Sequence, residues 1–439
     1  MITYPLSGPR PNLPSLTGAR WWAAVAVFIL HALVFLAVYP FQKSELFAAL
    51  HSFVPMQLGS GGVTFFFVLS GFLIYWSNSD VSGAKDILYY CRRRVTKIYP
   101  MHWLAFALFV LASASITRHG ITPAMDFSRL ELWLPNFLLI HTWNPQWAVL
   151  GGMNVPSWSL GAEMLFYLSF PFLVPLIRKV KPRANWAVFV GLFLVLVTIA
   201  TTVHFAFEGG WNTENAFVPR LWDMDVSPVA EPHADPVWFM QESIPVHMPY
   251  FFSYYFPASR LAEFFMGAMV AKMVAEGVFR NTNIVWPIIV LVIAFGATWL
   301  VPVAFKMAVV MLVPMCFVIG TLAVRDLNGL SGRIASPRAV LLGNISFAFY
   351  LIQFPVMVAL QRYVIAGHQW GFWGWLMSAL AAFAISFVLA WIMFTFVDDP
   401  LMKATARGPK RKRPNANVLA RDLKVVFGRD RRNSSRHRQ

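Results

Sequence analysis

The sequence predicts an all-α polytopic membrane protein, a bundle of about ten transmembrane helices. Three observations support this fold class: 58% of the 439 residues are hydrophobic, only 13% are charged, and the mean hydropathy is +0.57. An ordinary soluble domain does not combine these values, whereas a membrane protein does. We expect one membrane domain over residues 1–400, followed by a basic tail over residues 401–439.

Each expected helix is an apolar run close to the ~20 residues that a bilayer requires. The ten runs cover residues 20–39, 60–77, 98–117, 158–177, 185–205, 250–271, 284–302, 305–324, 341–364 and 371–396. A further run at 132–143 is too short and too rich in proline and tryptophan to span, so it is expected at the membrane interface.

The basic residues predict how these helices are oriented. With the N-terminus in the cytoplasm, 29 Lys and Arg lie inside, six lie outside, and Arg260 falls within a span. Cytoplasmic loops are enriched in Lys and Arg, so both termini are predicted to be cytoplasmic. Thirteen of the 36 basic residues follow Pro400, and this tail is expected to be disordered or to lie on anionic membrane lipid. The net charge of +16 is therefore explained without a nucleic-acid partner.

The longest predicted outer loop, residues 206–249, has a composition of its own. It carries seven carboxylates against the single basic Arg220, together with three tryptophans and six prolines. Aromatic rings beside carboxylates are common where proteins bind carbohydrate, and long loops are often functional. Glycan contact is one interpretation of this loop, and an ordinary solvated loop is the other.

The first span carries the most informative polar pair, Arg20 and His31. Eleven residues of helix rise ~16 Å and turn three times plus ~20°, so the two side chains share nearly one face. Arg20 is expected near one membrane surface and His31 near mid-bilayer. An ionisable side chain inside a span is by default a functional-site candidate. Histidine exchanges a proton near neutral pH and suits a general base, although a packed core histidine is the alternative.

The fourth span places Glu163 about one turn inside an apolar helix, with Tyr167 on the same face at i+4. A buried carboxylate must find a partner or take up a proton. The candidate partners are Arg20, His31 and Arg260.

Two further spans hold polar residues whose role is open. In the second span, glycines at 59, 61 and 62 and Ser70 suit close helix packing at least as well as substrate contact. In the sixth span, Arg260 and Glu263 at i, i+3 are expected to pair, either beside a substrate or to hold helices in register.

Basic residues precede the third span in a predicted cytoplasmic loop, where Arg94 and Lys97 share a helix face. Anchoring at the membrane surface explains them as well as binding of phosphates does, for example those of a coenzyme A. Neither a metal nor a disulfide is expected from Cys91 and Cys316, which lie in unrelated segments. Among the remaining histidines only His102 and His141 are secondary candidates.

These residues resemble the membrane-bound acyltransferase-3 family, which acylates glycans and other hydroxyl-bearing acceptors. The matching stretches, in order, are SLTGARWWAAVAVFILH, GGVTFFFVLSGFLI, RRRVTKIYP, VPSWSLGAEMLFY, RLAEFFMG and GNISFAFYLI. They run from about residue 15 to 400. The resemblance implies a ten-helix bundle that uses cytoplasmic acyl-CoA, most often acetyl-CoA, to modify an acceptor that is often on the outer side.

The resemblance also implies roles for individual residues. The family's arginine–histidine pair falls on Arg20 and His31, and its basic residues before the third span fall on Arg94 and Lys97. Its tryptophan–serine–glutamate motif falls on Trp158, Ser159 and Glu163. Three departures are Thr17, where the family usually has an acidic residue, Gln353, where it often has histidine, and Asp399-Pro400 in place of glutamate-proline. The first two leave His31 more alone as proton acceptor.

We therefore expect an O-acyltransferase of the bacterial inner membrane. Acyl-CoA would bind at Arg20, Arg94 and Lys97, and His31 would deprotonate the acceptor hydroxyl with help from Glu163. Substrate contact or structural support is expected from Ser70, Trp158, Ser159, Tyr167, Arg260 and Glu263. The alternative is a proton-coupled transporter or flippase of a lipid-linked glycan, in which the same buried charges form a proton relay.

Overall fold

The computed structural model describes Leu6 and residues 10–406, apart from 37, 54–55, 118–127, 208–247 and 366–367. These residues form helices joined by short turns, with no β-strand among them, which confirms the all-α fold class. Most of the predicted outer loop and most of the basic tail lie outside the described residues. Their suggested roles therefore stay predictions.

Ten long helices overlap the ten predicted spans one for one. They are α1 (Pro14–Phe35), α3 (Met56–Asn78), α4 (Gly83–Thr117), α7 (Trp158–Lys179), α8 (Asn185–Phe207), α11 (Pro257–Glu276), α12 (Val285–Ala297), α14 (Val309–Leu327), α15 (Pro337–Leu360) and α16 (Phe372–Met393). Within the described part of the chain, all but α11 and α12 are long and apolar enough to cross a membrane. The apolar segment containing α12 reaches only from Val285 to Leu300, and α11 carries four charged residues.

Shorter helices connect the long ones. They are α2 (Glu45–Phe53), α5 (Leu130–Phe137), α6 (Trp147–Leu150), α10 (Met248–Tyr250), α13 (Val303–Lys306) and α17 (Asp399–Ala404). The 132–143 run forms α5 and a 3₁₀ turn at His141–Trp143, so it is not a span.

Three predicted boundaries were wrong. The predicted span 250–271 is interrupted, because Phe256 is extended and Pro257 starts α11 as its first residue, a position that suits proline. The first helix starts six residues before residue 20, at Pro14, for the same reason. The basic segment before residue 98 is not a loop: α4 begins at Gly83 and runs through it.

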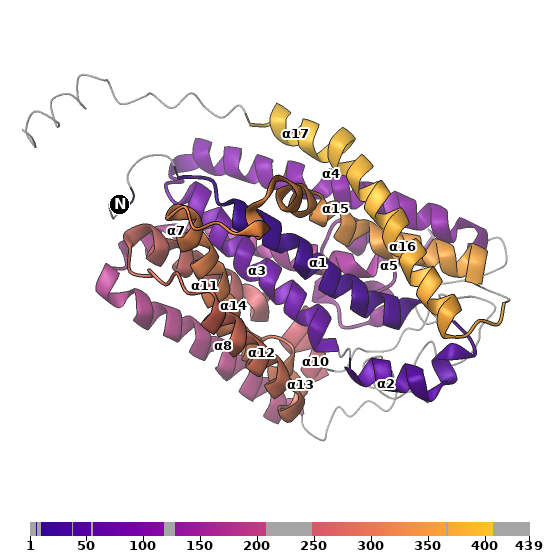
Figure 1. The fold of residues 1–439 in the computed structure, drawn as a ribbon. Coiled ribbons are helices and arrows are strands. Elements are labelled where there is room, and N and C mark those ends of the chain that lie inside the picture. Colours follow the sequence, from indigo (N-terminus) through magenta and orange to yellow (C-terminus); the bar gives the residue numbers. More distant parts are fainter. Residues whose placement is uncertain are drawn as a thin grey trace, which may run out of the picture.

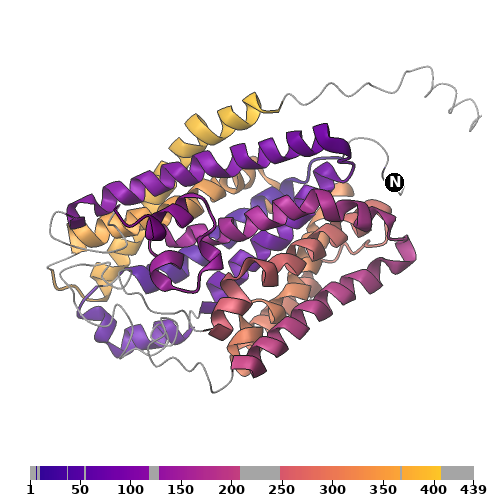
Figure 2. The same cartoon turned by 180° about the vertical axis from the view of Figure 1, so that it is seen from behind.

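The helices form a layered bundle in which α3 and α11 are enclosed by the others. Helices α4 and α16 make one flank and α8 the opposite flank (Figures 1 and 2). The central helices are buried along most of their length, whereas α8 and α16 expose many large apolar side chains. This distribution suits a bundle whose outer surface faces lipid rather than water.

Glycines bring two pairs of helices into backbone contact. Where α3 crosses α11, a Cβ atom on Gly71 would lie 1.8 Å from the carbonyl oxygen of Phe264, and one on Gly267 would lie 1.9 Å from that of Val68. Where α1 crosses α15, a Cβ atom on Gly343 would lie 1.8 Å from the Thr17 carbonyl oxygen. Small residues permit such close approach in membrane bundles, where dispersion contacts drive association.

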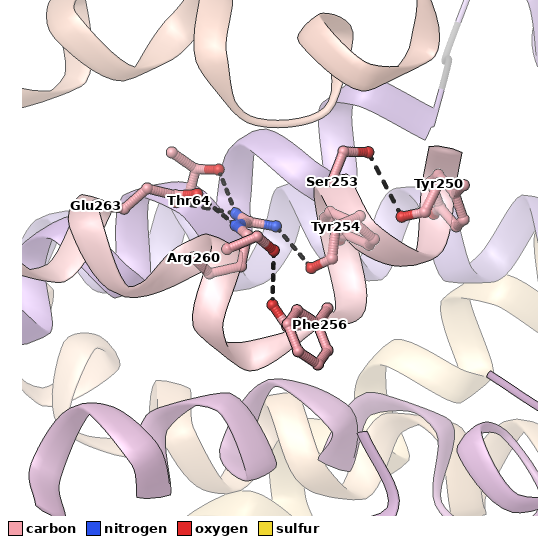
Figure 3. Close-up of polar contacts among 8 residues, drawn as sticks. Thr64, Tyr250, Ser253, Tyr254, Phe256, Arg260 and Glu263 are labelled. Atoms are coloured by element: carbon pink, nitrogen blue, oxygen red, sulfur yellow. Dashed lines mark hydrogen bonds and ion pairs between the residues drawn. The ribbon is translucent and has the colours of Figure 1, made fainter. Parts of the chain in front are cut away.

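A fully buried ion pair reinforces the α3–α11 crossing (Figure 3). The Arg260 guanidinium pairs with the Glu263 carboxylate, and neither side chain has any exposed surface. Its Nη1 donates to the Tyr254 carbonyl at 2.9 Å, and its Nη2 donates to Thr64 Oγ1 on α3 at 2.9 Å. The guanidinium also lies over the Phe67 ring, 5.0 Å from its centroid. The predicted local pair is confirmed, and its contacts hold helices together.

Substituting Gly71 or Gly267 by alanine should force α3 and α11 apart. We expect a loss of about 2 kcal/mol in each variant, since inserting atoms into a packed core typically has that effect. Thermal unfolding of the purified protein in detergent, followed by tryptophan fluorescence, measures it. Gly191→Ala on α8 is the matched control, because its Cβ would have no neighbour within 4 Å. Equal unfolding temperatures for all three variants would contradict the backbone contact.

Removing one partner of the buried ion pair should destabilise the protein far more than removing both. Glu263→Gln leaves an uncompensated guanidinium, which typically lowers stability by about 3–5 kcal/mol. The double variant Arg260→Met, Glu263→Met should recover at least half of that loss. Asp399→Asn serves as the control, because its exposed pair with Lys403 contributes at most about 1 kcal/mol. A Glu263→Gln protein as stable as the wild type would refute this structural role.

Candidate active site

Side chains from five helices enclose a cavity of about 150 Å³ in the middle of the bundle. Its polar lining comes from α1, α3, α4, α7 and α15. The residues are Arg20, Ser70, Arg94, Lys97, Ser159, Glu163, Tyr167 and Tyr350. Seven of these eight belong to the predicted site; Tyr350 does not. The structure therefore brings together residues from four predicted spans.

A chain of hydrogen bonds holds Glu163 in this cavity. The Tyr167 hydroxyl donates to Glu163 Oε2 at 3.0 Å, and Ser70 Oγ lies 2.8 Å from the same hydroxyl. Arg20 and Arg94 are close enough to attract the carboxylate electrostatically. The i, i+4 pairing with Tyr167 is thus confirmed, and the partners of Glu163 are not His31 or Arg260.

Arg94 carries a positive charge that no carboxylate neutralises directly. Its guanidinium lies 5.7 Å from the centroid of the Tyr90 ring and 5.9 Å from that of Tyr167, and its buried Nε has no hydrogen-bond partner. No carboxylate among the described residues lies within ion-pair distance of Arg94 or Arg20. These two half-buried guanidiniums can therefore bind an anionic ligand.

Lys97 differs from both arginines because it is paired. Its Nζ lies 2.5 Å from Oδ2 of Asp398, a side chain only 3% exposed in the π-helical turn Phe394–Asp398 that follows α16. Sequence reasoning missed Asp398 and considered the neighbouring Asp399, whose carboxylate instead binds exposed Lys403 at 2.6 Å. An acidic residue at the end of an apolar span, two residues before a proline, was the available signal. Lys97 lines the cavity, but much of its charge is neutralised there.

The start of α7 is fixed by polar and aromatic contacts. Ser159 Oγ lies 2.9 Å from the Tyr350 hydroxyl, which donates to the Pro156 carbonyl at 2.9 Å. Trp158 packs its ring against those of Tyr254 and Tyr255, with centroids 4.5 and 4.9 Å apart. Trp158 is buried beside the cavity and does not line it. These contacts orient the turn of helix that carries Glu163.

His31 lies outside this cavity, one turn before the end of α1. Because α1 runs from Pro14 to Phe35, Arg20 is deeper in its helix than the span 20–39 predicted, and His31 is nearer its far end. The ring packs at 5.2 Å against that of Phe35, and its Nδ1 is buried without a hydrogen-bond partner. His31 and Glu163 therefore do not share this cavity, and one ring nitrogen of His31 has no hydrogen-bond partner among the described residues.

The two secondary histidines have structural partners. His102 Nε2 lies 2.9 Å from the Asn136 carbonyl oxygen, and His141 Nε2 lies 3.5 Å from Ser157 Oγ. Both side chains are completely buried. Burial lowers the pKa of His141 to about 3, so its ring stays neutral at physiological pH. No group of three potential metal ligands occurs in the described part of the chain.

A second, larger hollow of about 1,030 Å³ opens at the end of the bundle where α1 begins. Arg10, Asn12, Trp76 and Asn344 contribute to its lining, and Leu73 lines both this hollow and the central cavity. The Arg10 guanidinium lies 5.4 Å from the centroid of the Trp76 ring. The two hollows therefore adjoin at Leu73.

Comparisons with known proteins agree with this architecture. The acyltransferase domain of the acyltransferase-3 family matches residues 13–395. Acyltransferase MdmB of Streptomyces mycarofaciens is 30% identical over 404 residues, covering 90% of this chain and 93% of that protein. Exopolysaccharide production protein ExoZ of Rhizobium meliloti (strain 1021) is 31% identical over 150 residues, 34% of this chain and 43% of that protein. No solved structure matches. The chain is an integral membrane protein that belongs to the acyltransferase-3 family.

Proposed function

We propose that this protein transfers an acyl group from acyl-CoA to a hydroxyl group of a glycan. It acts in the bacterial plasma membrane, which is called the inner membrane in cells that also have an outer membrane. One observation carries the proposal: Arg20 and Arg94 converge, without carboxylate partners at ion-pair distance, on a cavity in the middle of a membrane acyltransferase. Acyl-CoA is an anionic donor with an extended arm, and two unpaired guanidiniums suit its phosphates.

The two hollows, which share the lining residue Leu73, support a path for the donor. The larger one lies at the end that the positive-inside rule assigns to the cytoplasm, where acyl-CoA is made, and it can take the bulky nucleotide part. Arg20 and Arg94 then hold phosphate or carbonyl oxygens of the donor. Lys97, neutralised by Asp398, fixes α4 against the end of α16.

The size of the central cavity favours a short acyl group. Its ~150 Å³ corresponds to about five water molecules at the volume each has in the liquid. The donor arm can pass through this space toward His31 when it carries an acetyl group, whereas a bulky acyl group cannot pass. Acetyl-CoA is therefore the proposed donor.

The proposed reaction forms one bond and breaks one. The acceptor oxygen attacks the thioester carbonyl, its proton passes to His31, the C–O ester bond forms and the C–S bond breaks. Coenzyme A leaves as a thiolate and recovers a proton. Arg20 and Arg94 bind the phosphates of the donor and hold its extended arm, which carries the thioester toward His31. Glu163, held by Tyr167, lies within electrostatic reach of both arginines and adds a negative charge to the donor cavity.

Two observations favour a glycan as acceptor. One relative is named for exopolysaccharide production, and the predicted outer loop combines tryptophans with carboxylates. An acceptor approaching from the outer end would meet His31, which lies near that end of α1, before the donor cavity.

Replacing His31 by alanine should abolish most of the turnover. We expect kcat to fall by a factor of about 10² to 10⁴, the usual contribution of a positioned general base. The assay follows CoA release by the purified protein in detergent, with acetyl-CoA and a bacterial glycan fraction. His204→Ala on α8 is a matched control that should keep its activity, because His204 is remote from the cavity lining. A folded His31→Ala protein with normal kcat would exclude this mechanism.

Replacing Arg94 by glutamine should weaken donor binding. Hydrogen bonds to a charged group contribute about 1.5–3 kcal/mol, so KM for acetyl-CoA should rise about tenfold or more while the protein remains folded. Arg92→Gln, on the same helix but exposed and outside the cavity, should leave KM unchanged. If both variants behave alike, Arg94 only anchors α4 at the membrane surface.

The same assay separates acyl transfer from transport. A transferase consumes acetyl-CoA in detergent, where no gradient exists. A protein that releases no CoA from any donor, and yet moves protons or lipid-linked glycan across liposomes, would replace this proposal with the transporter.

A further inference from the structure

An apolar groove runs along the outside of the bundle between α1 and α12 and shares no lining residue with the central cavity. It encloses about 600 Å³, and α3 and α14 form its floor. Figure 1 shows α3 between α1 and α12 in this part of the bundle. Gly61 and Gly62 lie in the α3 part of the floor, while Trp22 and Val292, each 65% exposed, rise on the two walls.

The length of the groove matches one leaflet of a bilayer. On α1 its lining extends from Ser15 to Ala26, a helical rise of ~16 Å. Half of the ~30 Å hydrocarbon core is ~15 Å. A single hydrocarbon chain entering from one membrane surface can therefore occupy the groove along its whole length.

Two arginines stand at one end of this groove only. Arg325 and Arg333 line it at the end where α1 begins, which is the predicted cytoplasmic end. Arg333 is exposed, and Arg325 uses Nη1 to bind the Thr282 carbonyl at 2.9 Å. The neighbouring carboxylate of Asp326 accepts hydrogen bonds from Ser15 and Ser331. The groove is thus cationic at one end and apolar beyond it.

We propose that this groove binds one anionic glycerophospholipid of the cytoplasmic leaflet. One acyl chain lies between α1 and α12, and the phosphate lies at Arg325 and Arg333, because basic side chains at the membrane surface attract anionic headgroups. The acyl chain of the lipid fills a gap beside α12, whose apolar segment is too short to complete a span by itself. The lipid then acts as a structural component, whatever reaction the protein catalyses.

Native mass spectrometry of the delipidated protein tests the headgroup contact. The protein is titrated with phosphatidylglycerol or with phosphatidylcholine of identical chains. We expect one phosphatidylglycerol to bind more tightly than any phosphatidylcholine. Arg325→Gln and Arg333→Gln should each weaken the phosphatidylglycerol complex about fivefold and leave the phosphatidylcholine complex unchanged. An unchanged headgroup preference in both variants would overturn the proposal.

A groove-filling substitution tests the position of the acyl chain. Ala26→Phe places a ring in the groove and should remove the first bound lipid, together with the rise in unfolding temperature that phosphatidylglycerol gives the wild type. Ala384→Phe on the exposed face of α16 is the matched control and should keep both. Equal lipid binding by the two phenylalanine variants would refute the site. If Ala26→Phe does not fold, the arginine variants decide. If the protein co-purifies with an isoprenoid phosphate instead of a phospholipid, the proposed glycerophospholipid is the wrong ligand of this groove.

Discussion

The backbone contact between α3 and α11 is the constraint on which the candidate active site depends. Gly71 and Gly267 allow the two helices to touch, and Arg260 reaches from α11 to Thr64 on α3. Ser70 is the residue next to Gly71, so this crossing also sets where Ser70 meets the Tyr167 hydroxyl. Any separation of α3 from α11 would therefore loosen the hydrogen bonds that hold Glu163.

The buried charges of this bundle are arranged in two contrasting ways. The N–H groups of Arg260 donate to carboxylate, hydroxyl and carbonyl oxygens in a buried site. This network is a rigid element of the structure. Around Glu163, by contrast, Arg20 and Arg94 stay within electrostatic reach and form no direct ion pair. Incomplete pairing beside an open cavity is what distinguishes a binding site from a structural network.

The sequence predicted local relations well and long-range ones poorly. The pairing of Glu163 with Tyr167, and of Arg260 with Glu263, follows from helical spacing and was predictable. The pair of Lys97 with Asp398 joins residues 301 positions apart, and spacing carries no information about it. The apolar runs gave the number of helices, but hydropathy alone could not show that α4 begins at Gly83, because its first turns are polar. The grouping of site residues from four spans came from their resemblance to a family and not from their pattern.

The ion pair between Lys97 and Asp398 also bears on how the protein is made. During synthesis, α4 enters the membrane long before the chain reaches Asp398, and α15 supplies Phe347 and Tyr350 to the cavity only shortly before that point. A nascent chain of nine long helices therefore has an unpaired lysine where the finished protein has an ion pair beside the cavity. Assembly of the candidate site therefore waits for α15, and Lys97 gains its partner only after α16 has been made.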